Sequence, residues 1–446
     1  MKSRYVFPRN CAADLPVAVG GDGVYLIAQD GTRILDACGG AAVSCLGHSN
    51  PNVIAAIQKQ VGSLAYAHTS FFTSEPAEEL AEFLATRAPG DLNRVYFVSG
   101  GSEAMESALK LARQYFVEAG KPEKSQIIGR WQSYHGNTLG ALATGGNRWR
   151  RAQFAPLLSD AMHHIDPCYT YRGQRDDETE FDYGQRVANQ LEEKILELGA
   201  QTVAAFVAEP VVGATMGAVP SVDGYFKRIR AICDKYDVLL ILDEVMCGMG
   251  RTGHLFACNH DGVEPDMIAI AKGLGAGYQP IGALLVSDGI FDTLAAGTGF
   301  FQHGHTYLGH PTACAGALAV MHEIEAQNLL PAVRQRGEAL RASLTDKFGA
   351  HPNVGDIRGR GLFMGVELVE DRDTKAVFSP SKRVHARLKS SAMKAGLMCY
   401  PMGGTIDGQA GDHILLAPPF IIDDSHIAEI TDKLSIALEE TLEAIR

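Results

Sequence analysis

Apolar residues along the chain follow two patterns, which alternate over most of its length. Short continuous apolar runs predict strands that are buried on both faces. These runs cover residues 95–98, 126–129, 203–208, 239–242, 267–271 and 281–286. Helical spacing of apolar residues covers 51–61, 76–87, 224–236, 311–325 and 330–348. Strands that alternate with helices predict an α/β fold, in which helices sandwich a mostly parallel central sheet.

The same patterns divide the chain into three parts. Residues 1–50 carry a hairpin pattern with Asp30-Gly31 as its turn, and we expect this segment to pack with the small domain. Residues 51–330 carry the alternating pattern and predict a large domain. Residues 331–446 repeat a strand–helix–strand pattern, which predicts a smaller α/β domain. Residues 169–185 are polar and weakly patterned, which predicts an excursion on the surface.

Composition restricts both the function and the compartment. The chain has 446 residues, of which 46% are hydrophobic and 21% charged, as in ordinary globular proteins. Its formal net charge of −12 comes without a basic cluster, which argues against nucleic-acid binding. No apolar stretch is long enough to cross a membrane, and residues 1–8 lack the apolar core of a secretion signal. Nine cysteines without a CxxC pair are typical of reduced thiols, so we expect a cytoplasmic protein.

Two of the predicted strands end in groups that could share one site. The run 239–242 ends at Asp243, and the run 267–271 is followed by Lys272. The carboxyl ends of parallel strands meet at one edge of an α/β sheet, where such folds bind ligands. An amine and an acid at that edge suit pyridoxal phosphate (PLP), because a lysine forms its Schiff base and an aspartate keeps its pyridine nitrogen protonated. A buried Asp–Lys ion pair that only joins the strands explains this stretch equally well.

Other residues are expected at the same edge of the sheet. Residues 99–102 (SGGS) join a strand to a helix, where free N–H groups can bind phosphate; a plain turn is the alternative. Tyr134 follows the strand 126–129 and could stack on a planar ring or simply pack in the core. The glycines after Lys272 do not complete GxGxxG, which argues against a nicotinamide site. The histidines within 303–310 lack a ligand-like carboxylate pattern, so no metal site is expected.

The order of short motifs gives the most specific signal. The motifs are SGGSEA at 99–104, SYHGNT at 133–138, EPV at 209–211, LDEV at 242–245, GMGRTG at 248–253, AKG at 271–273, GHTY at 304–307, RGRGL at 358–362 and APP at 417–419. In this order they resemble the class III (ω-) aminotransferases, PLP enzymes of fold type I. The resemblance extends from Asp36 to Pro419. It implies an aspartate-aminotransferase-like fold, with the cofactor in the large domain and a transaminase activity.

The resemblance also implies roles for residues around the cofactor ring. Lys272 would form the Schiff base and, once released, move the proton during catalysis. Asp243 would hold the pyridine nitrogen. Val245 would pack against one face of the ring while Tyr134 stacks on the other.

Further roles concern the phosphate and the partner subunit. Gly101 and Ser102 would bind the phosphate through backbone and hydroxyl groups. Thr306 would reach the phosphate in the neighbouring subunit, which implies a homodimer with active sites at the subunit interface. Glu209 and His135 are expected among the cofactor-binding residues, Glu209 in a supporting role.

Two departures from the family pattern bear on the substrate. Many members that use 2-oxoglutarate carry a glutamate after EPV, which gates the arginine of the RGxG motif. Here Ala214 stands at that position, so Arg358 would lack that partner and could bind a substrate carboxylate. The mobile arginine of amine:pyruvate members is also missing from residues 406–413. We therefore expect an amine or ω-amino acid donor and pyruvate as acceptor, in a ping-pong mechanism through pyridoxamine phosphate.

Three alternative functions remain open from the sequence. The acceptor could be 2-oxoglutarate, or the enzyme could be a PLP-dependent racemase or aminomutase of the same fold. A non-catalytic PLP-fold binding protein is disfavoured, because Lys272, Asp243 and the phosphate-binding turn are all intact.

Overall fold

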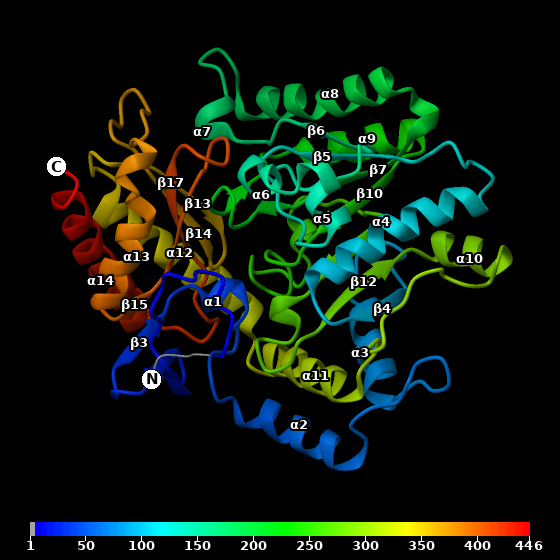
Figure 1. The fold of residues 1–446 in the computed structure, drawn as a ribbon, viewed down its shortest axis with the longest axis horizontal. Helices are drawn as coiled ribbons and strands as arrows, with labels where there is room; N and C mark the ends of the chain where they lie inside the picture. The colour runs from blue at the N-terminus through cyan, green and yellow to red at the C-terminus, as the bar shows by residue number, and fades with distance from the viewer. Residues whose placement is uncertain (1–4) are drawn as a thin grey trace.

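A seven-stranded sheet forms the centre of the computed structural model, which describes residues 5–446 (Figure 1). Its strands, in spatial order, are β4 (Arg94–Val98), β12 (Gly282–Val286), β11 (Met267–Ile270), β10 (Leu239–Asp243), β7 (Val203–Ala208), β5 (Gln126–Arg130) and β6 (Met162–Ile165). The strands from β11 to β6 run parallel, and β12 is antiparallel to both of its neighbours. The mostly parallel sheet predicted from the sequence is therefore confirmed.

Both faces of this sheet are buried, because alternate residues of each strand point to opposite sides. In β10, Leu240 and Leu242 join one hydrophobic core, while Leu239 and Ile241 join the other. The first core contains α3 (Glu75–Ala85), α8 (Glu180–Leu198), α9 (Tyr225–Tyr236) and α11 (Pro311–Ala326). The second contains α4 (Gly101–Glu118), α5 (Leu139–Thr144) and α10 (Asp288–Ala296). A sheet covered on both faces offers ligands access at the ends of its strands.

The C-terminal part of the chain forms a second, smaller sheet. Its strands β13 (Val354–Arg360), β14 (Phe363–Leu368), β17 (Asp412–Leu416) and β16 (Tyr400–Gly403) are antiparallel in this order. The helices of this part are α12 (Leu329–Phe348), α13 (Val384–Lys394) and α14 (Asp424–Glu443), and Figure 1 shows the group on the left. The predicted domain boundary at residue 331 falls in the first turn of α12.

The N-terminal segment pairs with this C-terminal part. The antiparallel strands β1 (Ala18–Asp22), β2 (Tyr25–Ala28) and β3 (Arg33–Asp36) are joined by a fourth strand, β15 (Leu397–Met398). β3 and β15 are parallel, with Leu35 opposite Leu397, and lie side by side in Figure 1. α2 (Pro51–Ser63) then leads into the large part of the molecule. Residues from the two ends of the chain thus form one sheet.

The prediction for residues 169–185 was incomplete: residues 170–182 are exposed or half-buried, as expected of a surface segment, but the segment has regular structure and buried ends. They include α7 (Thr170–Gly173) and the start of α8. Tyr183 is buried, and the buried Tyr169 Oη donates a hydrogen bond to the carboxylate of Glu367. The apolar face of α8 includes Val187 and Leu191, so its helical spacing becomes visible only beyond residue 185.

Three further predictions concern features that were not expected in the chain. Residues 1–4, part of the N-terminus in which no secretion signal was expected, lie outside the described residues. Within residues 5–446, no helix combines the length and the apolar character that crossing a membrane requires. The same residues contain no group of three or more His, Cys, Asp or Glu that could hold a metal ion.

Candidate active site

A cavity of about 230 Å³ lies at the carboxyl ends of β10 and β11. It brings together residues from segments that are far apart in the sequence. Among its lining residues are Gly101, Ser102, Tyr134, His135, Glu209, Ala214, Asp243, Val245 and Lys272. Nine residues expected at the site from the sequence thus share one cavity.

Asp243 ends β10 and is held in place by two neighbours. Its Oδ2 lies 2.8 Å from His135 Nδ1, and its Oδ1 accepts a hydrogen bond from Val245 N at 3.0 Å. Asp243 is 4% exposed and His135 2% exposed, so both partners are almost removed from water. An ionised carboxylate can only accept, so the histidine proton lies on Nδ1 in this pair. The hydrogen bond to His135 fixes the orientation of the Asp243 carboxyl group at the cavity.

Lys272 follows β11 and starts the short 3₁₀ turn η4 (Lys272–Leu274). Its φ of +46° lies in the left-handed region, which a residue with a Cβ adopts only when its surroundings impose it. Burial lowers the pKa of Lys272 to about 8, although the charges of Asp243 and Glu209 act in the opposite direction. The neutral amine, which attacks carbonyl carbons, is therefore more accessible than in an exposed lysine.

The start of α4 approaches Val245 closely. A Cβ placed on Gly101 would lie 2.7 Å from Val245 Cγ1, so a larger residue cannot fit without displacing the turn. Ser102 Oγ accepts a hydrogen bond from Asn137 N at 3.1 Å, which fixes the hydroxyl beside the helix start. The first N–H groups of a helix lack intrahelical acceptors and favour an anion. This turn can therefore hold a phosphate.

Glu209 positions the aromatic residue of the site rather than facing a cation. Its Oε1 accepts from Tyr134 N at 3.1 Å, and its Oε2 accepts from Gly213 N at 2.8 Å. Burial raises the pKa of Glu209, and the nearby Asp243 acts in the same direction. The first of these bonds fixes the backbone of Tyr134 at the cavity wall, and the second fixes the carboxylate of Glu209 against Gly213. The carboxylate, amine, anion-binding turn and aromatic ring together match the groups that a phosphorylated pyridine aldehyde requires.

Two of the predicted residues lie outside this cavity lining. Thr306 is exposed, and its carbonyl oxygen accepts a hydrogen bond from Tyr66 Oη at 2.8 Å. Arg358 is buried, with Nη1 at 2.6 Å from Glu367 Oε2 and 2.9 Å from Asp356 Oδ2. Arg358 therefore has carboxylate partners, and they come from β13 and β14 rather than from the segment that holds Ala214.

Several lining residues were not anticipated from the sequence. These are Arg9, Ala41, Gly136, Arg150, Met246 and Tyr400. Arg150 is one of three arginines within residues 148–151 (RWRR), a short run to which no role was assigned from the sequence. That run was the available signal. Gly136 belongs to the SYHGNT motif and Ala41 to a glycine- and alanine-rich segment, whereas Arg9, Met246 and Tyr400 carry no pattern that marks them as site residues.

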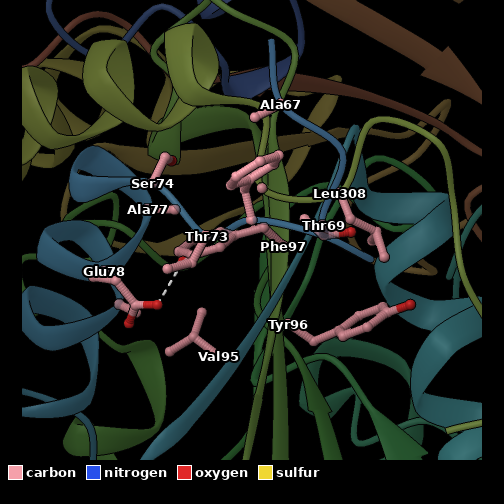
Figure 2. A pocket seen from close by; sticks show the side chains of 13 residues that line it. Ala67, Thr69, Thr73, Ser74, Ala77, Glu78, Val95, Tyr96, Phe97 and Leu308 are labelled. Carbon is pink, nitrogen blue, oxygen red and sulfur yellow. Dashed lines mark hydrogen bonds between the residues drawn. The ribbon is translucent and has the colours of Figure 1, made fainter. Parts of the chain in front are cut away.

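A second cavity, of about 300 Å³, lies beside α3 and β4 (Figure 2). Its lining residues include Tyr96, Phe97 and Leu308, and Thr73 Oγ1 donates to Glu78 Oε1 at 2.5 Å across its edge. Its lining includes no lysine, arginine or histidine. The chemistry described above therefore belongs to the cavity at Asp243 and Lys272.

Comparisons with known proteins agree with this geometry. The family model of the class III aminotransferases matches residues 9–438. An uncharacterized aminotransferase of Schizosaccharomyces pombe is 45% identical over 100% of this chain and 97% of its own. The putrescine–pyruvate aminotransferase of Pseudomonas aeruginosa is 36% identical over 95% of this chain and 90% of its own.

Solved structures give the same result. The omega transaminase of Pseudomonas jessenii, solved in complex with PMP, has a TM-score of 0.91 and 33% identity. The match covers 99% of this chain and 97% of that one. The chain therefore belongs to the class III aminotransferases, enzymes that use pyridoxal phosphate.

Proposed function

We propose that this aminotransferase moves an amino group from an ω-amino acid or amine to pyruvate. Transfer would occur in two half-reactions, with the amino group held as pyridoxamine phosphate between them. The observation that carries this proposal is the position of Asp243 and Lys272, which end adjacent parallel strands and line one cavity with the phosphate-binding turn.

Each lining residue has a defined task in this proposal. When bound, pyridoxal phosphate supplies an electron-accepting ring that stabilises negative charge on the substrate carbon. Lys272 binds the cofactor through its amine and afterwards moves a proton at that carbon. Asp243 holds the ring nitrogen in its protonated form, because a nearby carboxylate stabilises the positive charge. Tyr134 and Val245 enclose the ring, while Gly101 and Ser102 bind the phosphate.

The acceptor is assigned from the segment after Glu209. Ala214 lines the cavity, and its carbonyl oxygen is fixed by His413 Nε2 at 3.0 Å. The glutamate that gates the arginine in many members using 2-oxoglutarate is absent at this position. The Pseudomonas aeruginosa relative, which pairs putrescine with pyruvate, supports the same assignment.

We further propose that two copies of the chain form the active unit. Exposed aromatic side chains cluster on two neighbouring segments, 66–72 and 300–307, which Tyr66 joins by its bond to Thr306. Phe71 is 78% exposed, Phe72 67% and Tyr307 60%. Exposed apolar surface of this kind marks protein–protein contacts. Dimerisation would bury it and allow Thr306 to reach the phosphate of the partner subunit.

We also assign the protein to the cytoplasm. All nine cysteines are free thiols, and all except Cys11 are buried. Thiols that stay reduced are typical of the cytosol. Fractionation of cells that produce the protein, followed by detection in the cytosolic fraction, is the test; recovery from a secreted or organellar fraction contradicts the assignment.

A panel of amino donors with each acceptor tests the proposed reaction. Addition of an amine donor alone should shift the absorbance of the bound cofactor, and pyruvate should then restore it with formation of alanine. Restoration by 2-oxoglutarate and not by pyruvate would replace the acceptor. Racemised or rearranged donor without a keto product would instead establish a racemase or aminomutase.

A further inference from the structure

Arg150 is a cation of the cavity wall that has no acid partner. It lies in α6 (Arg148–Ala152), whose N-cap Asn147 accepts a hydrogen bond from Arg150 N at 3.1 Å. Its guanidinium carbon lies 4.7 Å from the centre of the Tyr134 ring. Within residues 5–446, no carboxylate oxygen lies within 4.0 Å of a guanidinium nitrogen of Arg150, the distance that defines an ion pair. The guanidinium is held by a ring face while its N–H donors remain available.

The acids of the cavity are already engaged by other groups. Asp243 is bound by His135 and by Val245 N, and Glu209 by two backbone N–H groups. Arg358 is held by Glu367 and Asp356 outside the lining. A substrate carboxylate that enters the cavity therefore meets Arg150 without displacing a carboxylate of the protein.

The position of Arg150 also suits a substrate that extends beyond the cofactor. A larger cavity of about 630 Å³ adjoins the first, and both are lined by Arg9, Arg150 and Tyr400. Arg9 belongs to the exposed N-terminal segment, whereas Arg150 is half-buried on a helix. Arg150 is therefore the better-positioned cation at the passage between the two cavities.

The charge of Arg150 influences the protonation of the Lys272 amine. Besides burial, the positive charge of Arg150 is among the influences that lower the pKa of Lys272. A carboxylate bound to Arg150 would neutralise that charge. Both groups line the same cavity, so a carboxylate-bearing substrate in it can contact Arg150 beside Lys272.

We propose that Arg150 binds the carboxylate of the 2-oxo acid acceptor and so selects carboxylate-bearing substrates, a proposal that rests on the proposed transamination. Two N–H groups of a guanidinium match the two oxygens of a carboxylate. The keto carbon next to that carboxylate would then face Lys272. This assigns to α6 the recognition role that the sequence had suggested for Arg358.

Pyruvate binding without turnover is the direct test. Pyruvate is titrated into the PLP-loaded enzyme without an amino donor, and the absorbance of the bound cofactor reports binding. Arg150→Gln should weaken pyruvate binding by roughly 10- to 100-fold, the usual loss for a hydrogen-bonded charge pair. Arg150→Lys should retain part of the affinity, because it keeps the charge and loses the fork of donors.

Arg148→Gln is the matched control. Arg148 lies two positions away on the same helix, is exposed, and stacks on Trp131 at 4.8 Å instead of lining the cavity. Its loss should leave pyruvate affinity unchanged. Equal pyruvate affinity in the wild type and Arg150→Gln would overturn the proposal. An equal loss of pyruvate affinity in Arg150→Gln and Arg148→Gln would overturn it as well.

The two half-reactions then separate this proposal from the proposed function. Arg150→Gln should raise the KM for pyruvate by a larger factor than it changes the rate of the cofactor absorbance change caused by a carboxylate-free amine. If no amine changes the absorbance in the wild type, transamination of amines is wrong. The binding titration still decides whether Arg150 holds a carboxylate in that case.

Discussion

The reacting residues of this site depend on close neighbours that hold them in place. Asp243 is held in a buried position because His135 and Val245 N bind its two oxygens. A buried carboxylate without such partners would be costly to ionise. Burial also acts on Lys272, whose pKa it lowers and whose neutral form it favours. The site therefore places a hydrogen-bonded acid and a partly neutral amine within one cavity.

The lowered pKa of Lys272 predicts how the cofactor-free protein takes up PLP. Below its pKa of about 8 the amine is protonated and unreactive, and above it the amine is neutral. Covalent uptake of PLP should therefore rise with pH to a midpoint near 8, against about 10.4 for an ordinary lysine. Stopped-flow absorbance across this pH range measures the midpoint. Lys227→Ala, which removes an exposed lysine of α9, should not shift it; a midpoint near that of a free lysine contradicts the prediction.

Secondary-structure elements bring these residues together through a few close approaches. The start of α4 contacts Val245 at Gly101. Glu244, in the loop after β10, accepts hydrogen bonds from the backbone N–H groups of residues 257 and 258. Both contacts lie next to residues of the site. Their effects on binding and stability can be separated by substitution.

Gly101→Ala should weaken PLP binding by about tenfold or more, because its Cβ would lie 2.7 Å from Val245 Cγ1 and displace the phosphate-binding turn. Gly100→Ala is the matched control. Gly100 is in an extended conformation with φ of 177°, and its Cβ would meet no atom within 4 Å. Equilibrium dialysis of PLP against both variants gives the comparison. Equal affinity of the two variants would show that the turn tolerates a side chain at Gly101.

Glu244 predicts a pH dependence of stability. Its Oε2 and Oε1 accept hydrogen bonds from Ala257 N at 2.6 Å and Cys258 N at 2.8 Å, and burial raises its pKa to about 7. The folded protein binds this proton more tightly than the unfolded chain does. Its contribution to stability is therefore fully present below the usual pKa near 4.5 and is lost as pH rises to about 7.

The free energy of unfolding should fall by about 3 kcal/mol between pH 4.5 and pH 7, the amount that corresponds to the pKa shift of Glu244. Urea unfolding at a series of pH values measures it. Glu244→Gln should flatten this part of the profile, because the amide does not titrate. An unchanged profile in the variant assigns the dependence to other groups.

The sequence was sufficient for the elements whose pattern is local. Residues 203–208 form one apolar run and are the strand β7, and the motifs around Asp243 and Lys272 come to one cavity. Arg150 was missed because its role depends on the orientation of α6 relative to Tyr134, which no local pattern encodes. The partners of Arg358 were missed for the same reason, since Glu367 lies on the neighbouring strand. Tertiary contacts of this kind can be identified only once the three-dimensional fold is known.

At the scale of the whole molecule, the exposed aromatic side chains predict the assembly. Phe71→Asp should convert the dimer to monomers and reduce activity, because a charge in an apolar interface is costly to bury. Sedimentation velocity measures the mass. Ile436→Asp, at an apolar residue of α14 that is 61% exposed, should leave the dimer intact. A wild type that sediments as a monomer at micromolar concentration contradicts the prediction.

The pairing of β3 with β15 has a consequence for how the chain is made. Leu397 is synthesised long after its partner Leu35. The N-terminal hairpin therefore has an open edge until Leu397 has left the ribosome, and an unpaired edge can associate with other chains. Contacts between the ends of a long chain also form slowly, because a large loop must close first. Recovery of soluble protein should accordingly depend on what shields the edge of β3 until synthesis ends.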